Sequence, residues 1–182
     1  MAKQTWVLDP THSELQFKVK HLMISTVTGQ FNDFKVEVET EGDDFTNAKI
    51  HFEAAASSVF TNNEQRDGHL RNSDFFDAGK YPVIVFESEK MERTSDDEYT
   101  LYGTLTIKGV SKKIALTAEF GGLTKDPWGN TRTGFTITGK INRFDFGMSF
   151  GSVSETGGLL LGDEVKINAN VQFIKEAVAY AA

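Results

Sequence analysis

The four histidines, His12, His21, His51 and His69, have the widest chemical range of the side chains in this sequence. They do not follow the H-x-H or H-E-x-x-H spacing that brings two ligands to one metal ion, so we expect no metal site. The chain contains no cysteine, which excludes disulfides, thiolate ligands and cysteine nucleophiles. Nucleophile-elbow, Walker and G-x-G-x-x-G motifs are also absent. The sequence therefore predicts no catalytic residue and no cofactor.

His21 differs from the other histidines because it ends a row of apolar residues. In "SELQFKVKHL", the residues Leu15, Phe17, Val19 and His21 alternate with charged or polar ones and share one face of a strand. Two interpretations remain open: a core histidine with one bonded partner, or a polar point in an apolar cavity. An unpaired buried imidazole costs about 1–3 kcal/mol, so both interpretations require a partner. The other three histidines are predicted at surface, capping or strand-end positions.

A charged pair follows the last-but-one predicted strand, in "NRFDFGMSFG". Arg143 and Asp145 lie two residues apart and share a phase. They are predicted either to form an ion pair at a strand end or to leave Arg143 free at a cavity mouth. A guanidinium fork in that position suits a carboxylate or phosphate head group. The sequence does not choose between these two roles.

Period-two alternation of apolar and polar residues dominates the chain and indicates eight or nine strands. The predicted strands cover residues 4–9, 13–22, 26–40, 45–54, 83–92, 99–108, 112–120, 132–143 and 163–175. The alternation slips at "FNDF" within 26–40, which indicates a bulge or a tight bend inside one long strand. Residues 62–76 lack the alternation, and Asn62 or Asn63 could cap a short helix there. We expect one short helical segment near 62–76.

Strands with one apolar face must bury it, and little helix is available to cover it. We expect the sheet to close into an antiparallel barrel or curve strongly, with a two-sheet sandwich as the alternative. Gly103 and Gly139 lie on inward phases, where the missing side chain leaves space or lets a strand bend. We predict a single domain over residues 1–182.

Phenylalanine is abundant, with 15 residues against 2 tryptophans and 4 tyrosines. Eight of them lie mostly on inward phases of separate strands: Phe17, Phe31, Phe34, Phe52, Phe86, Phe120, Phe135 and Phe173. They form a packed core if the barrel is filled, or line a tube for a long apolar chain if it is open.

The chain has a net charge of −7, which argues against nucleic acid and against an anionic membrane patch as partners. Its apolar runs are far shorter than the ~20 residues that span a bilayer, so we expect no stable membrane insertion. The first ten residues show no signal-peptide pattern. We therefore expect a cytoplasmic protein, or a periplasmic one if a leader has been removed.

Five blocks of sequence resemble the YceI-like family of polyisoprenoid-binding proteins. They are "WVLDPTHSELQFKVKHL", "TGQFNDF", "FFDAGKYPVIVFES", "LYGTLTIKGVSKKIAL" and "GKINRFDFGM", in order along nearly the whole chain. The resemblance implies an extended, lipocalin-like barrel of eight antiparallel strands. It also implies an apolar tunnel that holds a long isoprenoid or fatty-acyl chain, with no chemistry of its own.

The resemblance and the inward phases together give a set of predicted ligand-binding residues. The set is Phe17, Val19, His21, Phe31, Phe34, Phe86, Leu101, Leu105, Ile107, Phe135, Ile137 and Arg143.

Three functions follow as hypotheses. The leading one is non-catalytic binding, storage or transport of a long-chain isoprenoid or other amphiphilic lipid. The second is an enzyme acting on an isoprenoid or quinone-type lipid. The third is a stress-response structural protein with a filled barrel. A homodimer through paired strand edges is a further expectation.

Overall fold

Residues 3–151 and 160–177 are described by a computed structural model in which strands predominate. The strands are β1 (Lys3–Leu8), β2 (Glu14–His21), β3 (Ser25–Phe31), β4 (Phe34–Glu41), β5 (Asp44–Ala55), β6 (Val59–Phe60), β7 (Val83–Arg93), β8 (Glu98–Ile107), β9 (Val110–Lys125), β10 (Thr131–Asn142) and β11 (Leu161–Lys175). The α-helix is α1 (Glu64–Arg71), and 3₁₀ turns cover Pro10–His12, Ala56–Ser58 and Arg143–Phe146.

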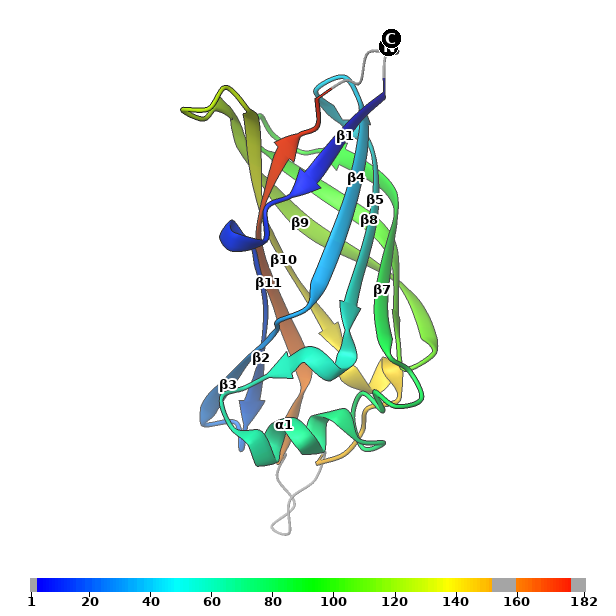
Figure 1. The fold of residues 1–182 in the computed structure, drawn as a ribbon. Coiled ribbons are helices and arrows are strands. Elements are labelled where there is room, and N and C mark those ends of the chain that lie inside the picture. Colours follow the sequence, from blue (N-terminus) through cyan, green and yellow to red (C-terminus); the bar gives the residue numbers. More distant parts are fainter. Residues whose placement is uncertain (1–2, 152–159, 178–182) are drawn as a thin grey trace.

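The strands close into an eight-stranded antiparallel barrel (Figure 1). Neighbouring strands follow the order β1-β4-β5-β7-β8-β9-β10-β11, and β1 then pairs with β11 to complete the ring. The closing register joins Trp6 to Lys175 and Leu8 to Phe173. Closure of the ring pairs its edge strands with each other. It also turns the apolar face of the sheet towards the barrel interior, away from water. The predicted barrel is confirmed, and the sandwich alternative is wrong.

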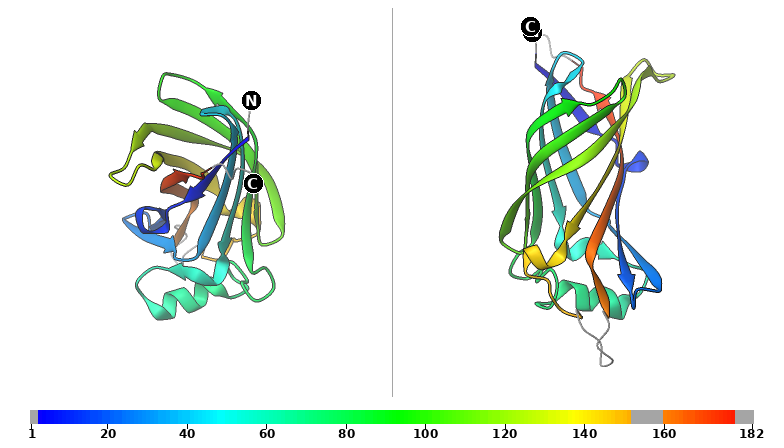
Figure 2. Two further views of the ribbon diagram at one scale, coloured as in Figure 1. Left: turned by 45° about the horizontal axis from the view of Figure 1, so that its top comes forward. Right: turned by 180° about the vertical axis from the view of Figure 1, so that it is seen from behind.

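The wall is extended at one end because β11 has two partners along its length. Residues 173–175 pair with β1, whereas residues 161–170 pair with β2. The hairpin of β2 and β3, together with the short β6, therefore forms part of the wall of the lower part of the barrel in Figure 1. The helix α1 lies across this end, as both views in Figure 2 show. We call it the helix end.

The prediction of one long strand over residues 26–40 is wrong. The chain forms β3 and β4, which are separated by Asn32 and Asp33 and have different neighbours. At the break the backbone bonds elsewhere: the Asn32 N–H donates to Ser58 O at 3.1 Å, and the Ala55 N–H donates to Asp33 O at 2.9 Å. The slip in "FNDF" thus marks a bend at which one strand ends and the next begins with other partners.

The predicted helical segment is confirmed. Asn63 is the N-cap of α1, and its side-chain oxygen accepts a hydrogen bond from the Arg66 N–H at 3.0 Å. A second tie fixes the helix to β6 through the buried Asp67, whose carboxylate accepts from the Thr61 N–H and hydroxyl. A helix this short depends on such tertiary contacts for its stability.

An aromatic cluster fills the end of the barrel opposite α1. Its members are Trp6, Phe45, Tyr99, Phe120 and Phe135, and we call it the aromatic plug. Ring centroids lie 5.1 Å apart for Phe45 and Phe135, and 5.2 Å apart for Trp6 and Phe45. The buried Trp6 indole N–H donates to Thr40 Oγ1 at 3.0 Å, which satisfies its only polar group. The barrel is therefore solid at this end.

Outside the plug, an ion-pair network connects the β9–β10 loop to the end of β1. Arg132 Nε donates to Asp126 Oδ2 at 2.7 Å, and Arg132 Nη1 donates to Asp9 Oδ2 at 2.8 Å. Asp126 Oδ1 also accepts from the Trp128 and Asn130 N–H groups at 2.9 Å. The hydrogen bond from Arg132, followed by those from the loop, lowers the pKa of Asp126 to about 2.

Asp126→Asn is expected to destabilise the fold at neutral pH and to have little effect in acid. The carboxylate has a lower pKa folded than its ordinary value of 3.8, so the stability it adds is present above pH 3.8 and lost as pH falls towards 2. Urea unfolding of both proteins across this range measures the difference. A wild-type advantage that stays constant down to pH 2 would contradict the assignment.

Candidate functional site

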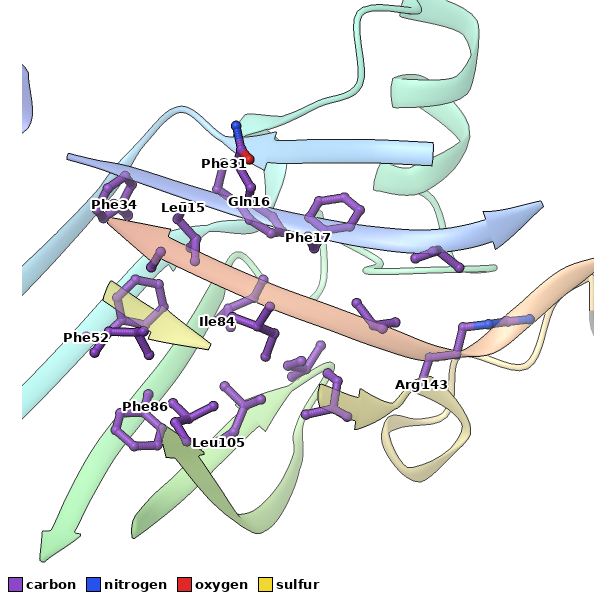
Figure 3. A pocket seen from close by; sticks show the side chains of 18 of the residues that line it. Leu15, Gln16, Phe17, Phe31, Phe34, Phe52, Ile84, Phe86, Leu105 and Arg143 are labelled. Atoms are coloured by element: carbon purple, nitrogen blue, oxygen red, sulfur yellow. The ribbon is translucent and has the colours of Figure 1, made fainter. Parts of the chain in front are cut away.

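The interior between the aromatic plug and α1 holds a cavity of about 770 Å³. Strands β2 to β5 and β7 to β11 contribute side chains to it, as do α1 and residues 75–76. Phe17, Phe31, Phe34, Phe52 and Phe86 project from different strands into the same space (Figure 3). The volume lies within the roughly 300–1,000 Å³ typical of small-molecule sites.

The cavity is long and narrow. Its lining on β11 runs from Leu161 at the helix end to Phe173 beside the plug. At about 3.3 Å per residue this stretch is roughly 40 Å long, or roughly 30 Å along the axis when strands tilt by about 40°. A volume of about 770 Å³ along that length suits an extended chain.

All twelve residues in the predicted ligand-binding set line this cavity: Phe17, Val19, His21, Phe31, Phe34, Phe86, Leu101, Leu105, Ile107, Phe135, Ile137 and Arg143. Their contact with a ligand stays a prediction. The alternation in β8 explains much of this agreement, because Leu101, Leu105 and Ile107 are all buried on its inward face.

The predicted environment of His21 is wrong. His21 lines the cavity only at its rim, where it is exposed to solvent. It is paired in register with Ser25 across the β2–β3 hairpin and with Leu161 of β11. No hydrogen bond to its ring is found among the described residues. The strand therefore leaves the apolar interior before it reaches His21.

Arg143 forms neither of the two interactions considered from the sequence. Its side chain is buried and donates to four backbone carbonyls: Gly162 at 2.7 Å, Met148 and Phe150 at 2.7 Å, and Leu161 at 2.9 Å. The pair with Asp145 is absent from the described ion pairs. Arg143 therefore ties the 3₁₀ turn and residues 148–150 to the start of β11. Burial lowers its pKa, partly offset by the charge of Asp163.

Sequence reasoning missed the polar contribution of α1 to the cavity. Arg66, His69 and Leu70 of α1 line it, and Arg66 and His69 are three residues apart on one helix face. Arg66 donates through Nε to Thr61 Oγ1 and through Nη2 to Thr61 O, at 2.7 and 2.6 Å. His69 Nε2 is 2.8 Å from Asp74 Oδ2, and its ring packs edge-on against Phe150. His69 was predicted as a surface or capping residue, although its spacing from Arg66 was a usable signal.

The inward glycines do not leave empty space. A Cβ atom at Gly139 would collide with the Leu116 side chain, and one at Gly103 would collide with the Phe86 ring and the Glu87 carbonyl oxygen. Neighbouring side chains therefore occupy the room that the sequence suggested for a ligand. At Gly103 the close approach of backbone excludes every larger residue.

The two remaining histidines lie outside the cavity. His12 is exposed, with Nδ1 2.8 Å from Asp9 Oδ2. His51 is on the outer face as predicted, but it is half-buried and bonded to Glu53 at 2.9 Å and to Glu87. The bond to Glu53 contributes most to raising the pKa of His51, and burial opposes it. Among the described residues, His, Asp and Glu side chains form no group suited to hold a metal ion.

Comparison with known proteins agrees with this architecture. Residues 6–173 match the YceI-like domain. The chain belongs to the YceI-like family. Similar YceI-like relatives include the UPF0312 protein SA2479 of Staphylococcus aureus (strain N315), which is 40% identical over 92% of this chain and 96% of its own. The resemblance seen in the sequence is thereby confirmed.

Solved structures show the same fold. The YceI protein of Campylobacter jejuni is 36% identical, with a TM-score of 0.76 over 87% of this chain and 90% of its own. A polyisoprenoid binding domain from Saccharophagus degradans has a TM-score of 0.71 over 94% of this chain and 98% of its own. At 17% identity, that domain shows a shared fold with this YceI-like chain and nothing finer. No helix in the described part of the chain is long and apolar enough to span a membrane.

Proposed function

We propose that this YceI-like protein binds a long-chain amphiphilic lipid, with an isoprenoid as the first candidate, and stores or carries it without altering it. The observation that carries the proposal is the elongated apolar cavity of about 770 Å³ between the aromatic plug and α1. Covering an apolar chain inside it removes that chain from water, at about 25 cal/mol per Å² of apolar surface buried.

The polar groups of the cavity support an orientation for the lipid. The plug end is aromatic, whereas Thr61, Arg66 and His69 lie at the helix end. An amphiphile would therefore place its tail against the plug and its head beneath α1. The solved polyisoprenoid binding domain of the same fold makes an isoprenoid tail the natural first probe.

The arrangement of the lining residues favours binding over chemistry. Nucleophilic catalysis needs a hydroxyl within hydrogen-bond reach of a base. The lining histidines, His21 and His69, have no bonded hydroxyl partner among the described residues, and the Thr61 hydroxyl is instead held by Asp67 and Arg66. A cavity that also lacks a metal-holding group in the described part of the chain supports a carrier or a store.

Native mass spectrometry of the purified protein tests the proposal. We expect a mass above that of the 20.2 kDa chain, which falls to the chain mass after organic extraction and rises by one ligand after incubation with geranylgeraniol. The extract should contain a long-chain lipid. A protein that carries nothing and takes up neither geranylgeraniol nor a long-chain fatty acid would contradict the proposal.

A further inference from the structure

The described ionisable side chains that line the cavity are all basic. Among the described residues, its lining contains two arginines and two histidines, Arg66, Arg143, His21 and His69, and no aspartate or glutamate. The whole chain shows the opposite bias, with 26 acidic residues against 19 lysines and arginines. Burial in an apolar site disfavours charges of both signs alike, so it explains why charges are few but not why only basic ones remain.

These four side chains gather at the helix end. Leu161 connects two of them, because it pairs in register with His21 and its carbonyl accepts from Arg143 at 2.9 Å. Phe150 connects Arg143 with His69, because its carbonyl accepts from Arg143 at 2.7 Å and its ring lies 4.7 Å from that of His69. Arg66 lies one helical turn from His69. The basic groups therefore surround one end of the cavity.

The two arginines at this end have no direct ion pair among the described residues, although the charge of Asp163 acts on Arg143 and Asp67 shares the Thr61 hydroxyl with Arg66. Arg143 is buried, yet its partners are carbonyls, and no carboxylate pairs with it or with Arg66 among the described residues. His69 alone has an acidic partner, Asp74. Of the five N–H groups on a guanidinium, Arg66 uses two on Thr61, which leaves three for a ligand.

We infer that the lipid carries an anionic oxygen head, a phosphate or a carboxylate, which Arg66 binds at the helix end with His69 and His21 beside it. Arg143 is a positioning residue, and its buried charge adds a favourable potential at the head. This inference rests on the proposed function, because it specifies the head group of the lipid that the apolar cavity holds.

Two ligands that share one tail and differ only in the head group, geranylgeranyl phosphate and geranylgeraniol, measure what the head group contributes to affinity. We expect the delipidated protein to bind the phosphate roughly tenfold more tightly than the alcohol at low salt, as one charge-assisted hydrogen bond provides. Added sodium chloride should reduce the ratio, because Arg66 is exposed to solvent. Geranylgeranoic acid, with a carboxylate head, shows whether any oxyanion suffices or phosphate is required.

Arg66→Gln is expected to remove most of that preference and to leave the alcohol affinity unchanged. Arg71→Gln is the matched control, since Arg71 is on the same helix, bonds a carbonyl through Nε, and does not line the cavity. It should leave both affinities unchanged. If Arg66→Gln also lowers the affinity for the alcohol, the salt dependence of the wild-type affinity ratio decides whether the head is bound through its charge.

Equal affinity for the phosphate, the acid and the alcohol overturns the inference and leaves the proposed function intact. A ratio that does not respond to salt, or that survives Arg66→Gln, also overturns it. Failure of every one of these lipids to bind instead contradicts the proposed function itself.

Discussion

Leu105→Trp is expected to abolish lipid uptake while the barrel stays folded. Leu105 is buried on the inward face of β8, opposite Phe86 of β7, and lines the middle of the cavity. In a filled core, the larger ring would cost about 1–3 kcal/mol of stability through overpacking. Beside an open cavity the indole has room, so the cost is smaller and the ring blocks the space for the tail. We expect the affinity for geranylgeraniol to fall at least about tenfold, the equivalent of 1.4 kcal/mol.

Thr104→Trp provides the matched control. Thr104 is the preceding residue of the same strand, and its hydroxyl contacts Glu89 on the outer surface at 3.3 Å. The same ring added there should leave uptake unchanged. Normal uptake by Leu105→Trp, or strong destabilisation without a change in affinity, would show that the lipid does not occupy the barrel interior. Gly103 is a poorer probe, because a side chain there would meet the Glu87 carbonyl.

Arg143→Met is expected to lower the free energy of unfolding by at least about 3 kcal/mol, since hydrogen bonds to a charged group contribute about 1.5–3 kcal/mol each. The substitution leaves the carbonyls of Met148, Phe150, Leu161 and Gly162 without their donor. Urea unfolding of the delipidated protein measures the loss. Arg143→Lys should recover little of it, because an ammonium lacks the planar fork that reaches several carbonyls at once.

Lys140→Met controls for the removal of a basic residue from the same region. Lys140 is exposed and lies 3.6 Å from Glu164, a surface pair worth no more than about 1 kcal/mol. We expect its unfolding midpoint to match that of the wild type closely. If Arg143→Met is as stable as Lys140→Met, then Arg143 does not hold the 3₁₀ turn to β11.

The parts of the fold that could be predicted are those encoded by local patterns. In β8 the alternation from Tyr99 to Ile107 is uninterrupted, and every inward residue is buried. The polar run with Asn63 at a capping position gave the helix. Both patterns involve residues that are close in sequence, so a single amino-acid sequence was enough to predict them.

The failures concern contacts between distant parts of the chain. Within residues 26–40 the chain bends at Asn32 and Asp33, and the different partners of the two halves show that β3 and β4 are separate strands. The role of Arg143 depends on the carbonyls of Met148, Phe150, Leu161 and Gly162, whose positions no side-chain pattern specifies. His21 has the inward phase, but phase does not reveal where along a strand the interior ends.

The crystal structure of the protein loaded with geranylgeraniol tests the central claim most directly. The account predicts continuous density for one extended lipid chain, from Phe135 at the aromatic plug to Arg66 of α1. The side chains that line the cavity should stay close to their present positions. Density for the lipid on the outer surface, with the barrel interior filled by rearranged side chains, would contradict it.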